Sequence, residues 1–174
     1  MSDVLIRRVR RDDGPRVKAI RLRALEADPS SFAATLERES AYDDGEWAEW
    51  AESDATGDQA TTLLAEQDGE PVGIVAAYRN ERDEHMFHVV AMWVAPEVRG
   101  RGVGRFLLDS VETWIADAGG TVAELMVAES SVAARRLYES AGYRPDGTTR
   151  LSEHMQGLTY VGMRKPVLLP RPAG

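Results

Sequence analysis

The stretch VVAMWVAPEVRGRGVGRF, residues 89–106, decides the expected fold. Its first six residues form an apolar run, the pattern of a strand that is buried on both faces. Ala95-Pro96 ends the run, because proline cannot donate a hydrogen bond to a neighbouring strand. Three glycines then alternate with other residues, and an amphipathic helix pattern follows. Since backbone N–H groups at a helix N-terminus attract anions, the stretch predicts a phosphate-binding loop flanked by Arg99, Arg101 and Arg105.

Two common phosphate sites do not fit the glycine spacing. A dinucleotide site needs G-x-G-x-x-G, and counting from Gly100 its third glycine would fall on Arg105. A nucleotide P-loop needs Gly-Lys-Ser/Thr, but the only lysines of the chain are Lys18 and Lys165. The loop is therefore expected to hold a phosphate ligand of another kind.

The composition narrows the class of protein. The chain has 174 residues, 43% of them hydrophobic and 29% charged, which predicts one globular domain with a proper core. It has no cysteine, and therefore no thiolate nucleophile and no thiolate metal site. No long apolar run and no signal peptide are present, so we expect a cytoplasmic protein. The net charge of −8 disfavours nucleic acid as a partner and is compatible with a cationic substrate.

Hydrophobic periodicity predicts alternating strands and helices. Asp68-Gly69 is a hairpin signal between two of the strands. The strand at 121–127 follows the strand at 84–94 through a helix, so these two should run parallel. We expect strands at 4–9, 61–67, 71–78, 84–94, 121–127, 143–149 and 157–164, and helices at 12–27, from about 32 to 52, at 103–118 and near 131–141.

Residues 26–58 form an acidic stretch in which Arg38 is the only base. Trp47 and Trp50 are three residues apart and should share one helical face. The acids either help to receive an amine or form a solvated helix face with the aromatic side chains in the core. The sequence leaves both readings open.

A second motif lies in SSVAARRLYESAGYRP, residues 130–145. Together with R-x-x-G-x-G after an apolar strand and V-x-P, it resembles the GCN5-related N-acetyltransferase (GNAT) family. The family's second motif is N-x-x-A-x-x-L-Y-x-x-x-G-F/Y, and Ser131 stands where Asn is usual. The resemblance covers residues 5 to 165, and the matching positions are Ala134, Leu137, Tyr138, Gly142 and Tyr143.

The resemblance implies an α/β (α+β) fold. Its central sheet should be mixed, mostly antiparallel and of about seven strands, with flanking helices and one splayed parallel strand pair. We expect a single domain over residues 1–166 and a C-terminal tail over 167–174.

Acetyl-CoA is the implied co-substrate, and no metal is implied. In the family, the loop amides hold the pyrophosphate, and a backbone N–H near the end of the first parallel strand points at the thioester carbonyl. The positions that correspond in this chain are Met92, Trp93, Val94, Arg99, Gly100, Arg101, Gly102, Val103, Gly104, Arg105, Ser131 and Arg135.

Tyr138 matches the usual general acid for the departing thiolate, and its alternative is a core tyrosine. The base is left open between His88, Glu84 and a water chain, with His85 nearby. By strand alternation, Glu84 and His88 would share a face with Met92 and Val94. His88 can accept a proton near neutral pH.

The implied reaction acetylates a primary amine by direct attack in a ternary complex. The acceptor is a small molecule or a peptide, with antibiotic, polyamine, amino acid and protein N-terminus all open. Glu26, Phe32 and Trp47 are the candidate acceptor-binding residues. Two alternatives are a catalytically silent acyl-CoA sensor and a nucleotide-binding domain of another fold. We expect neither nucleic acid nor membrane as a partner, and a homodimer is left open.

Overall fold

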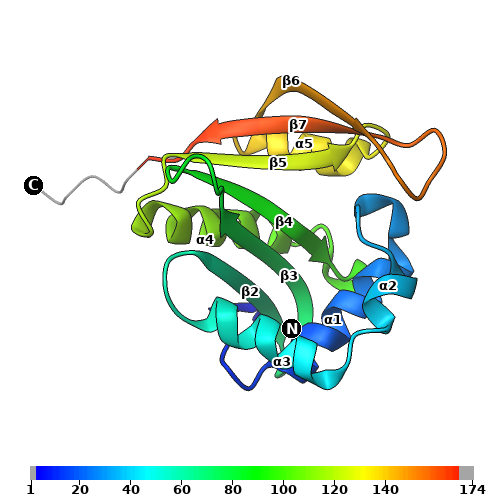
Figure 1. Ribbon diagram of the computed structural model, residues 1–174, viewed down its shortest axis with the longest axis vertical. Coiled ribbons are helices and arrows are strands. Elements are labelled where there is room, and N and C mark those ends of the chain that lie inside the picture. The colour runs from blue at the N-terminus through cyan, green and yellow to red at the C-terminus, as the bar shows by residue number, and fades with distance from the viewer. Residues whose placement is uncertain (1–2, 169–174) are drawn as a thin grey trace, which may run out of the picture.

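One mixed sheet organises the fold, with the strand order β1-β2-β3-β4-β5-β7-β6 (Figure 1). The computed structural model describes residues 3–168. The predicted count of about seven strands and the mostly antiparallel sheet are confirmed. The strands are β1 (Leu5–Arg8), β2 (Ala60–Gln67), β3 (Glu70–Arg79), β4 (Met86–Val94), β5 (Val122–Ala128), β6 (Arg144–Leu151) and β7 (Thr159–Pro166).

Strands β4 and β5 form the parallel pair, and they separate early. Their register holds from Met86↔Val122 to His88↔Glu124 and no further, although β4 runs on to Val94 and β5 to Ala128. Figure 1 shows the two strands diverging toward their C-terminal ends. The predicted splayed pair is therefore present, and it opens the middle of the sheet.

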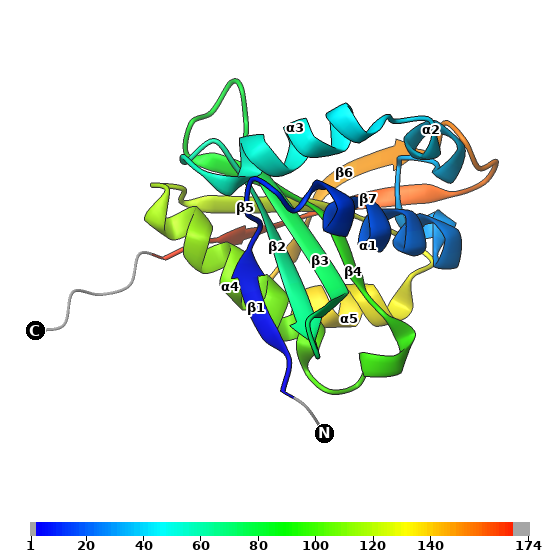
Figure 2. The same ribbon diagram turned by 90° about the horizontal axis from the view of Figure 1, so that it is seen from below.

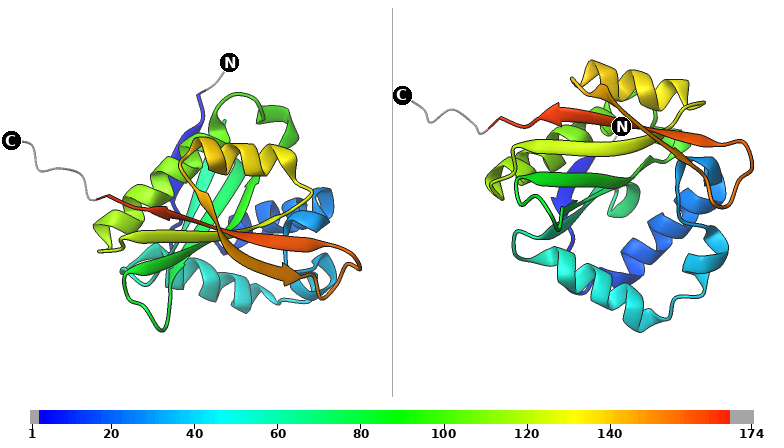
Figure 3. Two further views of the ribbon diagram at one scale, coloured as in Figure 1. Left: turned by 90° about the horizontal axis from the view of Figure 1, so that it is seen from above. Right: turned by 45° about the horizontal axis from the view of Figure 1, so that its top comes forward.

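The helices cover both faces of this sheet. Figure 2 shows α1 (Gly14–Ala27) and α3 (Asp44–Ala55) on one side of β1–β4 and α4 (Val103–Asp117) on the other. In the right-hand view of Figure 3, α5 (Val132–Ser140) lies across the sheet from α1 and α3. The space between the diverging strands is thus bordered by helices from both sides.

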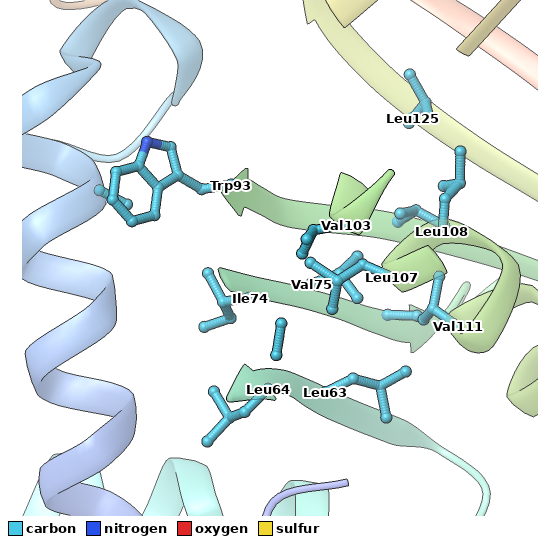
Figure 4. Close-up of a cluster of buried hydrophobic side chains, with 14 of the residues drawn as sticks. Leu63, Leu64, Ile74, Val75, Trp93, Val103, Leu107, Leu108, Val111 and Leu125 are labelled. Atoms are coloured by element: carbon cyan, nitrogen blue, oxygen red, sulfur yellow. The ribbon is translucent and has the colours of Figure 1, made fainter. Parts of the chain in front are cut away.

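The main core lies between α4 and the sheet. Helix α4 carries apolar residues at spacings of three and four, and Leu107, Leu108 and Val111 are fully buried. Figure 4 shows Val75 of β3 beside Leu107, whereas Ile74 and Trp93 lie toward α1. Burial of this stripe anchors α4 and thereby places its N-terminus against the end of β4.

The single helix expected from about residue 32 to 52 is wrong, because two helices occupy this stretch. They are α2 (Leu36–Ser40), capped by Thr35, and α3, which begins at a capping box between Asp43 and Glu46. This reciprocal cap satisfies the first N–H groups of α3 and so starts a new helix. Ser30 and Ser31 cap no helix and belong to a short 3₁₀ turn (Pro29–Ser31).

The strand expected to begin at residue 84 begins instead at Met86. The preceding turn extends further, because the Met86 N–H donates to the Asp83 carbonyl at 3.0 Å and the His85 N–H donates to the Asp83 carboxylate. Glu84 therefore lies in the turn, and its side chain is 80% exposed.

The chain remains packed just past β7. Val167 is buried, and its N–H donates to the Thr121 carbonyl at 2.8 Å. The rest of the expected tail, from residue 169, lies outside the described residues. Within residues 3–168, no helix is both long enough and apolar enough to span a membrane.

Candidate functional site

A β-bulge interrupts β4 where it leaves β5. Val90 pairs with Ala76 and Trp93 with Ile74, so two residues of β4 lie opposite one residue of β3. Ala91, within the bulge, has φ of 56°, which is rare for a residue with a side chain. Such strain persists only where the surroundings enforce it, and bulges redirect the side chains that follow them.

The bulge reverses the alternation of side chains along β4. Before it, Phe87 packs edge-on against Trp114 of α4, and His88 faces the other side of the sheet. After it, Met92 and Val94 lie under Gly104 of α4. The expectation that His88 shares a face with Met92 and Val94 is therefore wrong, because a bulge shifts the period of two.

The glycine loop leads from β4 into α4. Gly100 and Gly102 have φ of 74° and 80°, and Gly102 is the N-cap of α4. This left-handed conformation is accessible to glycine at little cost. A Cβ built on either residue would meet no atom within 4 Å, so the backbone faces open space. The first N–H groups of α4 are consequently accessible to an anion.

Arg99 does not simply extend into solvent beside this loop. Its Nε donates to the Val94 carbonyl at 2.8 Å, and its Nη2 donates to Asp28 Oδ2 at 2.7 Å. The same carboxylate oxygen accepts the Trp93 indole N–H at 2.6 Å. Burial alone would raise the pKa of Asp28, but the hydrogen bonds from Trp93 and Arg99 outweigh it and hold the pKa below its usual range.

A cleft of about 430 Å³ lies between the diverging strands, the loop and α5. It reaches from Asp28 and Ser31 on the α1 side to Leu137 on the α5 side, so it passes through the sheet. Most of the residues that the sequence assigned to acyl-CoA line it: Met92, Trp93, Val94, Arg99, Gly100, Gly102, Val103, Gly104, Arg105 and Ser131.

Tyr138 also lines this cleft, although only 7% of the residue is exposed. It projects from α5, and its ring packs edge-on against Tyr143 with the centroids 5.9 Å apart. Burial raises the pKa of the Tyr138 hydroxyl well above its usual value, so the group stays protonated and can act as a proton donor.

Two of the residues predicted to bind acyl-CoA do not line the cleft. Arg101 lies at a separate hollow with Leu5 and Phe106. Arg135 turns back toward the residues that precede α5, where its Nη1 donates to the Glu129 carbonyl at 3.3 Å.

Of the three candidate bases, His88 lies apart from Glu84 and His85, which are neighbours in one turn. His88 is half-buried on the sheet, with Nε2 2.8 Å from Asn80 Nδ2 and Nδ1 3.3 Å from Glu124 Oε1. Glu84 and His85 lie in the exposed turn before β4. Of the three, His88 lies nearest to the point where β4 and β5 separate.

The three candidate acceptor residues do not line the cleft. Glu26 is exposed on α1. Phe32 is buried beneath the Arg21 guanidinium, which lies 4.8 Å from its ring centroid. Trp47 is 1% exposed and packs between Tyr42 and Trp50. The aromatic pair thus belongs to the core.

Three residues that line the cleft were predicted neither as site residues nor as matching positions of the second motif: Asp28, Ser31 and Ala133. Asp28 belongs to the acidic stretch and directly precedes Pro29, which ends α1, so its place at a helix terminus was a readable signal. Its partner Arg99 lies 71 residues away in the chain, and no sequence spacing indicates that contact. Among residues 3–168, no group of three or more His, Cys, Asp or Glu side chains is arranged to hold a metal.

The sequence and the fold of this chain are similar to those of known proteins. The model of the acetyltransferase (GNAT) family matches residues 21–143. An uncharacterized N-acetyltransferase of Archaeoglobus fulgidus is 35% identical over 92 residues, which are 50% of this chain and 62% of that protein. The match thus covers less than two thirds of that relative's own length.

Two solved structures share the fold. An acetyltransferase of the GNAT family from Streptococcus pneumoniae superposes with a TM-score of 0.82 at 23% identity, over 95% of this chain and 99% of its own. The protein yncA of Salmonella typhimurium, solved with its cofactor acetyl-CoA, gives a TM-score of 0.79 at 18% identity, over 99% and 98%. With the family model matching most of the chain, the protein belongs to the GNAT acetyltransferase family.

Proposed function

We propose that this protein transfers an acetyl group from acetyl-CoA to a primary amine, a small molecule or a peptide. One observation carries the proposal. A single cleft combines the glycine loop, the bulged end of β4 and a buried, protonated tyrosine. Family membership supports acetyl-CoA as the donor.

The residues of the cleft suit this donor. The open backbone of Gly100 and Gly102 offers N–H groups to a pyrophosphate. Arg99 and Arg105 lie beside it, paired with Asp28 and Asp109. When bound, acetyl-CoA supplies the acetyl thioester. The apolar side chains of Met92, Val94 and Leu137 suit its uncharged arm. As the family resemblance implies, a backbone N–H near Met92 donates to the thioester carbonyl in this proposal.

Two further roles complete the proposal. Tyr138 donates a proton to the departing sulfur, for which its hydroxyl must be protonated at the working pH. The acceptor amine must lose a proton before it attacks, and we assign this step to the neighbourhood of His88 and its partner Glu124. These two side chains lie on the face that carries α1 and α3, opposite the face of α4.

Two experiments test the proposal. Acetyl-CoA should raise the melting temperature far more than NAD or ATP, since a ligand at a hundredfold excess over Kd stabilises by about 2.7 kcal/mol. A panel of amines, polyamines, amino acids and peptides should then include acceptors that release thiol from acetyl-CoA. Equal shifts from all three ligands would contradict the donor site. Tight binding of acetyl-CoA with no turnover on any amine would favour a sensor instead.

A further inference from the structure

Residues 28–32, which begin the connection from α1 to α2, are anchored at both ends, and we call them the strap. At the first end, the Asp28 carboxylate accepts hydrogen bonds from the Trp93 indole N–H at 2.6 Å and from Arg99 at 2.7 Å. Trp93 is the last residue but one of β4. This end of the strap is therefore fixed to the C-terminal end of β4.

The other end of the strap is held by Tyr160 of β7. The Tyr160 hydroxyl donates to the Phe32 carbonyl at 2.9 Å and to the Ser30 carbonyl at 3.2 Å. A hydroxyl carries a single proton, so the two carbonyls share it. Only 5% of Tyr160 is exposed, and burial raises the pKa of its hydroxyl, so this proton is present at neutral pH. The strap thus has a second anchor, on a strand far from it in the sequence.

The two anchors lie on opposite sides of the gap in the sheet. Tyr160 pairs with Ala128, which is the last residue of β5. The strap therefore runs from the end of β4 to the end of β5, where these strands are no longer paired (Figure 1). A short tether that is fixed on both sides of a gap limits how far the two sides can part.

The strap also forms the wall of the cleft on the α1 side. Asp28 and Ser31 line the cleft there, whereas the glycine loop and Leu137 line its opposite side. The donor is proposed to occupy the side of the glycine loop, so an acceptor has to approach the thioester past the strap. Ser30, the neighbour of Ser31, is exposed and does not line the cleft.

We infer that Tyr160 is a positioning residue for the acceptor: it holds the strap across the open end of the sheet and thereby fixes Ser31 at the acceptor's entrance. The inference rests on the proposed acetyl transfer. The two anchors then serve different substrates. Asp28 also holds Arg99, which begins the glycine loop, so a change at Asp28 reaches the donor. A change at Tyr160 loosens the far end of the strap and should reach the acceptor alone.

Tyr160→Phe tests this assignment, because it removes the hydroxyl and keeps the buried ring. With the acceptor found in the amine screen, KM should rise about 5- to 10-fold, while kcat and the Kd for acetyl-CoA stay within about twofold. Tyr42→Phe, a half-buried tyrosine that packs on Trp47, is the matched control and should change none of the three. An unchanged KM in Tyr160→Phe, or a loss confined to kcat, would overturn the inference.

Two neighbouring serines test the place of the strap at the entrance. Ser31→Leu adds bulk to a residue that lines the cleft and should raise the KM for the acceptor about tenfold or more. Ser30→Leu adds the same bulk one residue earlier, away from the cleft, and should leave KM unchanged. Equal effects of the two variants would contradict the position given to Ser31.

The strap can also be observed without turnover. The Ser31 N–H donates to the Asp28 carbonyl at 3.0 Å, and its exchange with solvent reports on opening of the strap. In Tyr160→Phe, peptides that cover residues 28–32 should exchange about tenfold faster in hydrogen-exchange mass spectrometry, whereas peptides of β7 should not change.

This measurement separates the inference from the proposed function. Unchanged exchange of the strap in Tyr160→Phe would overturn the inference even if no amine is acetylated. Failure of the proposed function would appear differently, as lost acetyl-CoA binding or absent turnover in the original protein.

Discussion

Asp28 and Arg99, 71 residues apart in the sequence, are joined by a 2.7 Å hydrogen bond between Oδ2 and Nη2. The same oxygen accepts a hydrogen bond from the Trp93 indole N–H. This one carboxylate therefore ties the end of α1 to the end of β4 and to the first residue of the glycine loop. The arginine that begins the family motif thus has a structural partner, and the loop depends on α1 for its position.

Asp28→Asn should weaken acetyl-CoA binding several-fold and lower the free energy of unfolding by about 1 kcal/mol, since it removes a hydrogen bond between charged groups at a partly exposed site. Calorimetric Kd and urea unfolding measure the two effects. Glu49→Gln, an exposed acid on α3, serves as the control. Lower stability with an unchanged Kd would mean that Asp28 supports the fold and not the loop.

Gly104→Ala should impair acetyl-CoA binding without loss of stability. The added methyl would lie 3.3 Å from Leu137 and close to Met92 and Val94, all of which line the cleft. Alanine is favoured over glycine within a helix by about 1 kcal/mol, so the melting temperature should hold. We expect Kd to rise about tenfold, equivalent to 1.4 kcal/mol. Gly102 is a poorer test, because its φ of 80° makes any side chain there strained.

Tyr138→Phe should lower kcat about 10- to 100-fold while leaving the Kd for acetyl-CoA unchanged, because the hydroxyl is used only as charge builds on sulfur. Burial raises the pKa of this hydroxyl, so the loss should be constant from about pH 7 to 10.

Tyr143→Phe is the control for the Tyr138 variant. It removes the hydroxyl from the neighbouring ring, whose oxygen is buried near Glu112. It should keep kcat. Full activity of Tyr138→Phe, with the chemical step limiting, would make Tyr138 a core residue only.

The Arg21–Glu39 pair offers a test of the α1–α2 contact. Arg21 Nε donates to Glu39 Oε2 at 2.8 Å, and both side chains are almost fully buried. Glu39→Leu should destabilise by about 3–5 kcal/mol, because a buried guanidinium is left unpaired. The double variant Arg21→Met, Glu39→Leu should recover most of that loss in denaturant unfolding. A double variant as unstable as the single one would show that the loss comes from packing and not from the unpaired charge.

Asp13 should make stability depend on acidic pH. Burial opposes its ionisation, but Arg7, the Arg10 N–H and Arg16 outweigh burial and hold the Asp13 pKa below its usual value. Its stabilisation is therefore present above the unfolded pKa of about 3.9 and is lost as pH falls through the lower folded value. Asp13→Asn should reduce the fall in the free energy of unfolding that is measured between about pH 5 and 2, whereas the exposed Asp12→Asn should not. If Asp13→Asn lost stability at acidic pH as much as the original protein, other carboxylates would cause the acid sensitivity.

The sequence was informative wherever structure is local. The apolar run before Pro96, the alternating glycines and the stripe from Val103 to Asp117 depend on residues within one or two turns of each other, so strand, loop and helix could be predicted together. The error at residues 32–52 was also local, since the Asp43–Glu46 capping box was present in the sequence.

The sequence by itself determined the family, the sheet, the glycine loop and the tyrosine of α5, because these follow from motifs and periodicity along the chain. Only the tertiary structure decided which way β4 faces after Ala91, because a bulge depends on pairing with β3. It alone joined Asp28 to Arg99 and brought Asn80 and Glu124 within 2.8 Å and 3.3 Å of the two ring nitrogens of His88. Hydrogen bonds between such distant residues arise from the packing of separate elements, which no spacing along the chain encodes.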